Sequence, residues 1–425
     1  MNISELYQLY KQSYLVSTDT RTIEKGCLFF ALKGDNFNGN KFAEKALSEG
    51  ASYAIVDEAT YQTQPNTILV EDVLKTLQAL STYHRNELNI PIIGLTGSNG
   101  KTTTKELINA VISKKYKTVA TRGNLNNHIG VPLTLLSMTP ETEIGIVEMG
   151  ANHIKEIAFL SSIAQPDYGY ITNFGKAHIE GFGSVEGVIK GKSELYRYLQ
   201  EHNKKAFVNT NDTLQLEKTK DIKKVTFGGS NSDFPINFIE ANPFVHVEFN
   251  KKVVKSQLIG SYNFNNIAAA LAMGSYFNIK EVDCIDAIEN YVPTNNRSQI
   301  ILQNSNKIIL DAYNANPSSM QVALENLSGL SDKSKIAILG DMFELGDTAE
   351  YEHQAIIDMI GELSLEKTYL IGENFYKCSS PDKNITLFKS FDDFKKHFPN
   401  LKVKNTTLLI KASRSMALER VLELL

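Results

Sequence analysis

The sequence predicts an α/β protein of three domains: a small α/β N-terminal domain, a central P-loop-type domain with a mostly parallel sheet, and a C-terminal Rossmann-like domain. Three observations support this fold class. The chain has 425 residues, more than the ~250 to 300 that one hydrophobic core usually serves. Short apolar segments alternate with helical segments, as in parallel sheets covered by helices. One of these apolar segments runs directly into a glycine-rich turn followed by a lysine and threonines.

We place the domains at residues 1–88, 89–297 and 298–425. In the first, strand-like segments at 26–32 and 54–56 flank a helical stretch at 41–49. In the central domain, strands are expected at residues 92–95, 144–147, 168–171 and 206–208. In the third, they are expected at residues 308–310, 336–339, 369–371 and 408–410. Alternation of such strands with helices favours doubly wound sheets.

Composition excludes several classes of function. With 42% hydrophobic and 22% charged residues, the chain has the make-up of a soluble globular protein. A net charge of −4 argues against nucleic acid or an anionic membrane as partner. No apolar run reaches the ~18 to 20 residues of a membrane span, and residues 1–14 lack a signal-peptide core. We therefore expect a cytoplasmic protein without membrane insertion. Cys27, Cys284 and Cys378 fit neither a disulfide framework nor a zinc site and are expected to be buried thiols.

The turn after residues 92–95 is expected to bind phosphate. It departs from the usual G-x-x-x-x-G-K-[ST] pattern, because Leu95 stands where the first glycine would be. A strand before it and a helix expected at 106–113 still supply the context of such a loop. Glycines let backbone N–H groups approach a polyphosphate, Lys101 adds a charge, and the Thr102 hydroxyl can ligate Mg²⁺. The expected nucleotide-binding residues of this loop are Gly97, Ser98, Asn99, Gly100, Lys101, Thr102 and Thr103.

Polar side chains also follow two neighbouring strands. Glu148 follows strand 144–147, and Asn173 and His178 follow strand 168–171. Ligands of open parallel sheets bind beyond the carboxyl ends of the strands. A carboxylate and an imidazole beside a triphosphate suit a divalent cation. The alternatives are a helix-capping or solvated Glu148 and a histidine that is merely hydrogen-bonded.

Two further segments have ordinary structural interpretations. Residues 191–196 are expected to open an amphipathic helix, with Lys176, Lys190 and Lys192 on a solvated basic face. Residues 311–317 end a strand and are expected to form a loop terminated by Pro317.

Asn263 and Asn266 precede an alanine-rich helix expected at 267–273, and are expected to form an N-cap cluster. Together, the residues alone indicate a magnesium-nucleotide enzyme with an α/β domain on either side of the nucleotide-binding domain.

The motifs also resemble those of a known family across nearly the whole chain. The segments that carry this resemblance are 19–21, 34–42, 96–105, 123–132, 148–150, 173–183, 313–317, 339–346 and 411–416. The sequence resembles the Mur ligases of peptidoglycan synthesis, within them the member that adds D-alanyl-D-alanine to UDP-N-acetylmuramoyl-tripeptide. The resemblance implies these two substrates, ATP, an acyl-phosphate intermediate, ADP and phosphate as products, and a monomer.

The resemblance also assigns chemistry to residues. It implies Lys101, Lys192 and His178 as catalytic residues, and two Mg²⁺ held by Thr102, Glu148, His178 and Lys192. Lys192 stands where these ligases carry a lysine carbamylated by CO₂. Carbamylation needs a neutral amine, so the pKa of Lys192 is expected to be lowered by its surroundings.

Further residues are assigned by the same resemblance. Asn263, Asn266, Arg297 and Asp311 are expected at ATP, Thr20 and Arg21 near the UDP-sugar, and Asn314 and Asn316 at substrate. Domain closure around the ligands is expected. The chain departs from common family motifs at Tyr262, at 38–40 and at Ala312. Rival interpretations are a sister ligase that adds the third peptide residue, a folylpolyglutamate-type ligase, a kinase, and a nucleotide-gated binding protein without catalysis.

Overall fold

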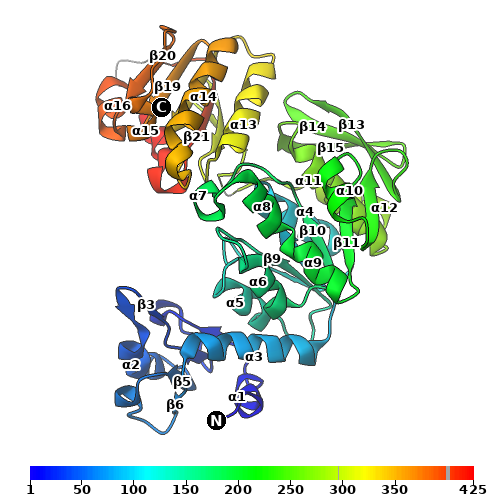
Figure 1. The fold of residues 1–425 in the computed structure, drawn as a ribbon, viewed down its shortest axis with the longest axis vertical. Helices are drawn as coiled ribbons and strands as arrows, with labels where there is room; N and C mark the ends of the chain where they lie inside the picture. The colour runs from blue at the N-terminus through cyan, green and yellow to red at the C-terminus, as the bar shows by residue number, and fades with distance from the viewer. Residues whose placement is uncertain (295, 399–402) are drawn as a thin grey trace.

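The computed structural model describes residues 1–294, 296–398 and 403–425 and contains three α/β domains that follow one another along the chain (Figure 1). The predicted fold class is confirmed by these sheets. The N-terminal domain has a parallel sheet in the order β1-β2-β5-β6 and a short hairpin of β3 and β4. Its strands are β1 (Val16–Ser17), β2 (Leu28–Phe30), β3 (Lys33–Gly34), β4 (Phe37–Asn38), β5 (Tyr53–Val56) and β6 (Thr67–Leu69). Its helices are α1 (Ile3–Tyr10), α2 (Ala43–Ser48) and α3 (Val73–Leu88).

Helix α3 joins the N-terminal domain to the central domain, and Figure 1 shows it lying between them. It begins where the Asp72 carboxylate accepts from the backbone N–H of Lys75 at 2.9 Å, and ends at Asn89 in the left-handed conformation. On its buried face, a His84 ring nitrogen contacts the carbonyl of Met138 at 2.9 Å. The contact between His84 and Met138 ties α3 to the central domain.

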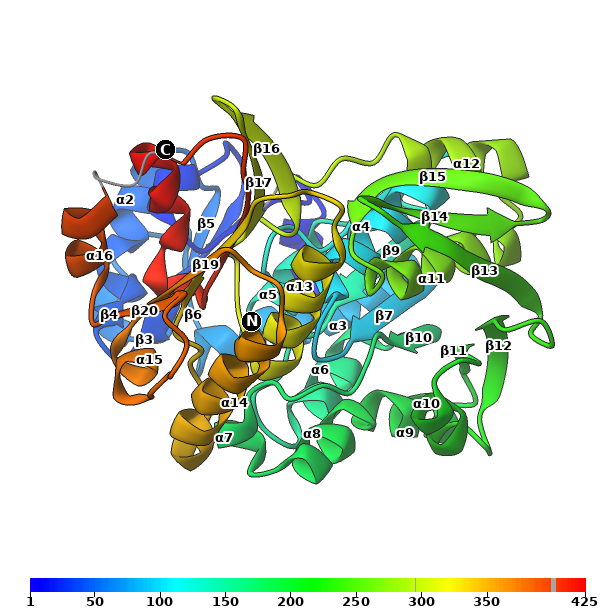
Figure 2. The same cartoon turned by 90° about the horizontal axis from the view of Figure 1, so that it is seen from above.

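The central domain has a nine-stranded sheet in the order β15-β14-β13-β12-β11-β10-β7-β9-β8. The strands from β8 to β13 pair in parallel, whereas β13, β14 and β15 are antiparallel and were not predicted. The strands are β7 (Ile92–Thr96), β8 (Thr118–Ala120), β9 (Ile144–Glu148), β10 (Tyr168–Ile171), β11 (Lys205–Asn209), β12 (Lys223–Gly228), β13 (Phe234–Ala241), β14 (Phe244–Phe249) and β15 (Lys252–Ile259). Figure 2 shows the antiparallel strands at the end of the molecule away from the C-terminal helices.

Helices cover both faces of this sheet, and each face has its own buried apolar cluster. The helices are α4 (Lys101–Ile112), α5 (Gly130–Leu136), α6 (Glu156–Ala164), α7 (Ile179–Phe182), α8 (Val185–Lys192), α9 (Glu194–Glu201), α10 (Thr213–Lys218), α11 (Asn263–Tyr276) and α12 (Glu281–Glu289). Burial of both faces explains why the central strands read as continuous apolar runs.

The C-terminal domain has six strands in the order β16-β17-β21-β18-β19-β20, parallel except for the β16–β17 pair. The strands are β16 (Gln299–Gln303), β17 (Asn306–Asp311), β18 (Lys335–Gly340), β19 (Lys367–Ile371), β20 (Ile385–Phe388) and β21 (Thr407–Lys411). The helices are α13 (Pro317–Gly329), α14 (Ala349–Glu362), α15 (Glu373–Lys377) and α16 (Phe391–His397). All four strands predicted here are present, and β16 and β20 are additional.

Two helix starts differ from the prediction. Helix α4 begins at Lys101 and not at Glu106, because the threonines form its first turns and Thr104 donates a buried hydrogen bond to the Asn266 side chain at 2.9 Å. Pro317 does not terminate a loop. It opens α13, whose N-terminus the Asn316 side chain caps by accepting from the backbone N–H of Ser319 at 2.9 Å.

Two interpretations of polar residues were also wrong. Residues 191–196 do not open a helix: α8 ends at Lys192 and α9 begins at Glu194. Asn263 and Asn266 are not N-caps, because they lie within α11 and their side chains bond inward, Asn263 donating to the carbonyl of Ile259 at 2.7 Å. Tertiary hydrogen bonds here replace the local capping that asparagine usually provides.

The three cysteines are buried and free, as expected. Within the described ranges, no helix combines the length and the apolar character needed to cross a bilayer.

Candidate functional site

A cavity of about 730 Å³ lies between the central and C-terminal domains, at the carboxyl ends of β7, β9 and β10. Its position agrees with the general placement of ligands in parallel sheets. The predicted site residues that line it are Ser98, Asn99, Gly100, Lys101, Thr102, Thr103, Glu148, His178, Asn263, Asn266, Arg297, Asp311, Asn314 and Asn316. The structure therefore brings most of the predicted site together from both domains.

The predicted phosphate loop runs from β7 into α4, and its glycines are required by geometry. Gly97 has φ +143°, and a Cβ there would meet the Thr172 hydroxyl at 2.0 Å. Gly100 has φ +78°, and a Cβ there would meet the Asn266 side chain at 2.8 Å. Both glycines thus allow a close approach of the loop to its neighbours that no other residue permits.

Hydrogen bonds within the protein hold the loop in place. The backbone N–H of Asn99 donates to the Asn173 side chain at 3.0 Å. The carbonyl of Asn99 accepts from the Thr172 hydroxyl at 2.6 Å, and the Ser98 hydroxyl donates to the carbonyl of Gly175 at 2.9 Å. The loop is therefore preorganised by the segment that follows β10.

Lys101 bridges the loop. Its Nζ donates to the carbonyls of Gly97 at 2.7 Å and Ser98 at 3.2 Å. Burial lowers the pKa of Lys101, and the nearby charge of Arg297 lowers it further, while Glu148 opposes the shift. An anionic phosphate would supply the counter-charge that this position favours.

Glu148 ends β9 beside the loop and is almost fully buried. Its Oε1 accepts from Asn126 Nδ2 at 2.8 Å and from the Thr102 hydroxyl at 3.3 Å. Its Oε2 is buried without a hydrogen-bond partner among the described residues. A buried carboxylate oxygen left unpaired is costly, and together with the Thr102 hydroxyl it has the chemistry of a Mg²⁺ ligand. The helix-capping interpretation of Glu148 is therefore not favoured.

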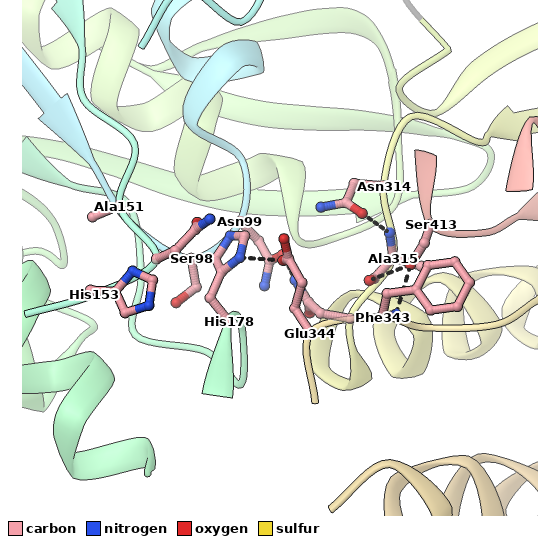
Figure 3. A network of polar contacts seen from close by, with 12 residues as sticks. Ser98, Asn99, Ala151, His153, His178, Asn314, Ala315, Phe343, Glu344 and Ser413 are labelled. Atoms are coloured by element: carbon pink, nitrogen blue, oxygen red, sulfur yellow. Dashed lines mark hydrogen bonds and ion pairs between the residues drawn. The ribbon is translucent and has the colours of Figure 1, made fainter. Parts of the chain in front are cut away.

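His178 lines the cavity but contacts the other domain. Its Nδ1 lies against the Glu344 carboxylate of the C-terminal domain, and this contact lowers the pKa of the Glu344 carboxyl (Figure 3). In the described parts of the chain, three or more His, Cys, Asp or Glu side chains do not gather into a metal-binding group. The predicted metal ligands thus need phosphate oxygens or water to complete a coordination shell.

Lys192 is fully buried, with 0% exposure, so its predicted place on a solvated basic face was wrong. Its Nζ donates to the carbonyl of Ala151 at 2.9 Å and lies 5.0 Å from the centre of the Phe182 ring. Burial lowers the pKa of Lys192 well below its ordinary value, and the charge of Lys101 adds to this. The direction of this shift agrees with the expectation drawn from the sequence.

Lys192, Lys190 and Lys176 do not share one surface. Lys192 is not among the residues that line the cavity, whereas Ala151, which its Nζ contacts, is. Lys190 is exposed, and Lys176 pairs with Glu352 of the C-terminal domain at 2.7 Å.

Residues of α11 and of the segment that leads into the C-terminal domain line another side of the cavity. Asn266 Nδ2 donates to Asn263 Oδ1 at 2.7 Å. The Arg297 guanidinium stacks 3.7 Å above the Tyr313 ring. The polar asparagines and this planar cation-aromatic pair are suited to hold a base and its ribose.

Asp311, Asn314 and Asn316 form the C-terminal wall of the cavity. Asp311 accepts from Lys411 Nζ at 2.5 Å. Asn314 accepts from the backbone N–H of Ala315 at 2.9 Å (Figure 3). Asn316 Nδ2 donates to Asn99 Oδ1 in the phosphate loop at 2.7 Å, which joins the two domains directly.

Thr20 and Arg21 lie elsewhere, in a short 3₁₀ turn of the N-terminal domain, and neither lines the cavity. The Arg21 side chain is 85% exposed and pairs with Asp19 at 2.5 Å.

Sequence reasoning missed three residues. Asn126 holds Glu148, Lys411 holds Asp311, and Glu344 holds His178. Asn126, Glu344 and Lys411 all stand in segments that carry the family resemblance, but a local pattern does not reveal contacts between distant segments.

Comparisons with known proteins identify the family. Three family descriptions match in succession: "Mur ligase family, catalytic domain" at residues 12–92, "Mur ligase middle domain" at 95–274, and "Mur ligase, glutamate ligase domain" at 296–414. The UDP-N-acetylmuramoyl-tripeptide–D-alanyl-D-alanine ligase of Bacillus subtilis is 35% identical over 97% of this chain and 94% of its own length. Its Escherichia coli counterpart is 33% identical over 96% and 93%.

Solved structures agree. A crystal structure of MurF from Acinetobacter baumannii matches with a TM-score of 0.87 at 29% identity, covering 99% of this chain and 97% of that one. MurF from Thermotoga maritima, solved in complex with ADP, matches with a TM-score of 0.84 at 28% identity, covering 96% of each chain. The sequence matches along its whole length and the shared three-domain structure establish that this chain belongs to the Mur ligase family.

Proposed function

We propose that this chain is an ATP-dependent peptide ligase that joins D-alanyl-D-alanine to UDP-N-acetylmuramoyl-tripeptide in the synthesis of peptidoglycan precursor. One observation carries the proposal. A single cavity holds a preorganised phosphate loop with Lys101, the unpaired Glu148 oxygen and His178 of one domain, facing the Asp311 to Asn316 segment of another. The relatives named for this reaction match the chain from end to end.

The reaction has two steps. A carboxylate oxygen of the tripeptide attacks the γ-phosphorus of ATP, and the bond to the β–γ bridging oxygen breaks to release ADP. The amine of D-alanyl-D-alanine then attacks the acyl carbon, phosphate leaves, and the nitrogen loses one proton as the amide forms. Lys101, held at the loop, stabilises the negative charge that collects on the transferring phosphoryl group.

The oxygen donors present suit Mg²⁺, because hydroxyl and carboxylate oxygens beside nucleotide phosphates are its usual ligands. Thr102 and Glu148 would hold it through these oxygens, and His178 would add a ring nitrogen. When bound, it neutralises phosphate charge and polarises the phosphoryl oxygens. We assign Asn263, Asn266, Arg297 and Asp311 to the nucleoside side of ATP, in agreement with their place in the cavity.

Lys192 is proposed to carry a carbamate. A neutral amine adds to CO₂ with loss of one proton, and burial keeps this amine neutral at lower pH than usual. The resulting anion would help to organise a second Mg²⁺. Lys192→Ala should lose activity that short carboxylic acids restore, and full activity without them would contradict this role.

We assign the domains in the same way. The N-terminal domain, with Thr20 and Arg21, would bind the UDP-sugar, and the C-terminal domain, with Asn314 and Asn316, the amino substrate. The buried free thiols suit the reducing cytoplasm, where the enzyme would work as a monomer.

The test is phosphate release by purified protein with Mg-ATP and the UDP-linked tripeptide, with and without D-alanyl-D-alanine, and with product mass read in parallel. We expect release that depends on the dipeptide and a product heavier by one condensed dipeptide. Release without amide would indicate a kinase or a different acceptor, and no release would favour a non-catalytic binding protein.

A further inference from the structure

The contact between His178 and Glu344 joins two domains at the metal-binding side of the cavity (Figure 3). His178 precedes α7 in the central domain, and Glu344 follows β18 in the C-terminal domain. Both residues adopt the left-handed conformation, with φ of 54° and 62°. Such conformations are uncommon for residues other than glycine, so contacts with the surrounding structure help to hold them.

The backbone supports the same contact. The N–H of Glu180 in α7 donates to the carbonyl of Glu344 at 3.2 Å. Gly346 lies against Glu180, and a Cβ at Gly346 would be 3.4 Å from that side chain. The loop that contains Glu344 therefore contacts the start of α7 through its main chain, and its carboxylate contacts His178.

The chemistry of the pair fixes the histidine ring. The two side chains are in contact, although Nδ1 has no hydrogen-bond partner of good geometry among the described residues. Because an ionised carboxylate can only accept, this contact favours the tautomer in which Nδ1 carries the proton. In the neutral ring, the lone pair is then on Nε2, the nitrogen left to ligate a metal. Histidine ligands of metals usually donate their second ring N–H to a carboxylate in this way.

We propose that Glu344 is a positioning residue that completes the metal site from the C-terminal domain, by holding His178 in the tautomer and orientation that present Nε2 to the metal. The proposal rests on the proposed function, in which His178 is a metal ligand. Its consequence is that metal binds most tightly only when the domain that carries the acceptor amine is docked. Phosphoryl transfer is thereby coupled to docking of the C-terminal domain, which is proposed to bind the amine that attacks the acyl phosphate.

A neighbouring ion pair provides a matched control. Lys176 lies two residues before His178 in the sequence. Its Nζ pairs at 2.7 Å with Glu352, which also belongs to the C-terminal domain. This pair crosses the same interface and does not touch the histidine pair. Glu352→Ala therefore removes one interdomain ion pair while leaving the Glu344 carboxylate and the backbone bond from Glu180 to hold the domain beside His178.

The experiment measures two properties in the full-length protein. Ring ¹⁵N chemical shifts of His178 report its tautomer without metal, and electron paramagnetic resonance reports the affinity for Mn²⁺ with a non-hydrolysable ATP analogue bound. For Glu344→Ala we expect loss of the single tautomer and an affinity for Mn²⁺ lower by about 10- to 100-fold. Glu344→Gln keeps an accepting oxygen, so it should keep the tautomer and most of the affinity. Glu352→Ala should keep the tautomer and hold the affinity within about twofold, because the Glu344 contact and the backbone bond from Glu180 remain in place.

An unchanged tautomer and affinity in Glu344→Ala would overturn the proposal, as would an equal loss in Glu352→Ala. His178→Ala separates this failure from failure of the proposed function. If His178→Ala lowers the affinity for Mn²⁺ and Glu344→Ala does not, only the role of Glu344 is wrong. If His178→Ala has no effect on the affinity, the assignment of His178 as a metal ligand is wrong.

Discussion

The two walls of the cavity differ in how their polar groups are satisfied. On the central wall, Glu148 Oε2, His178 Nδ1 and Arg297 Nε are buried without hydrogen-bond partners in the described structure. On the C-terminal wall, Asp311 is held by Lys411 Nζ and by the backbone N–H of Ser298 at 3.1 Å, and Asn316 is bonded at both ends of its amide. A wall with unpaired buried groups is prepared for ligand charge, whereas a satisfied wall supplies shape and docking contacts. Substitutions on the two walls should therefore have different kinetic effects.

The largest effect is expected at Lys101. Lys101→Met removes the cation that faces the transferring phosphoryl group and should lower kcat by about 10³-fold, with little change in thermal stability. Lys114→Met is the control: Lys114 lies just beyond the other end of α4 and makes a surface pair with Asp286, so activity should be kept. Phosphate-release kinetics measure both variants, and a loss of less than tenfold in Lys101→Met would place the chemistry elsewhere.

Glu148→Gln tests the unpaired oxygen. Gln still accepts from Asn126, but it loses the charge that would bind metal, so affinity for Mn²⁺ should fall by about 10- to 100-fold. Without metal, removal of an unpaired buried charge should leave the free energy of unfolding unchanged or raise it. Titration with Mn²⁺ and chemical denaturation measure the two effects. Clear destabilisation without metal would show that Oε2 is satisfied in solution.

Asn316 tests the C-terminal wall. Asn316→Ser keeps an N-cap for α13 but cannot reach Asn99, so KM for the dipeptide should rise about fivefold, the equivalent of one hydrogen bond of about 1 kcal/mol. The affinity for the ATP analogue should change less than twofold. Asn316→Ala loses the cap as well and should cost about 1 kcal/mol of stability. If Asn316→Ser lowers kcat and leaves KM unchanged, the C-terminal wall does more than supply shape and docking contacts, and the account of the two walls is wrong.

Lys192 gives the smallest expected effect, on stability as a function of pH. Because burial lowers the pKa of Lys192, the unfolded chain holds this proton up to pH values near 10.5, where the folded protein has already lost it. The free energy of unfolding therefore rises with pH between the folded pKa of Lys192 and pH 10.5. Below the folded pKa the folded protein buries a charged amine, and the destabilisation is then at its full size.

Lys192→Met removes that cost. In CO₂-free buffer it should be more stable than the unaltered protein, with the difference largest below the folded pKa and shrinking as the pH approaches 10.5. Denaturant midpoints over the pH range measure this. A variant that is less stable at every pH would mean that the amine is stabilised as a cation.

Local patterns predicted those parts of the molecule that local chemistry determines. The parallel strands β7, β9 and β10 and the glycine turn between β7 and α4 were predicted because a doubly buried strand and a glycine turn leave clear signals. The antiparallel strands β13 to β15 were missed, although β14 alternates buried and half-buried residues. The direction of the Lys192 pKa shift followed from the family resemblance and not from periodicity, which had placed this lysine in solvent.

The remaining site depends on contacts between distant segments. Asn263 and Asn266 read as caps because asparagine usually bonds locally, but packing of α11 against α4 redirects their amides. The partners of Glu148, His178 and Asp311 are distant in the sequence: Asn126 is in the loop before α5, Glu344 is in another domain, and Lys411 is in the neighbouring strand β21. A single sequence shows the residue types that such a site needs, and only the folded chain shows which of them meet.

The most direct test is a crystal structure with Mn²⁺ and a non-hydrolysable ATP analogue, with the metal located by its anomalous scattering. We predict a metal within about 2.0 to 2.5 Å of Glu148 Oε2 and a phosphate oxygen, with the Thr102 hydroxyl beside it and the triphosphate on the loop of Lys101. A metal or triphosphate bound away from Glu148 would contradict the assignment of this wall as the catalytic one.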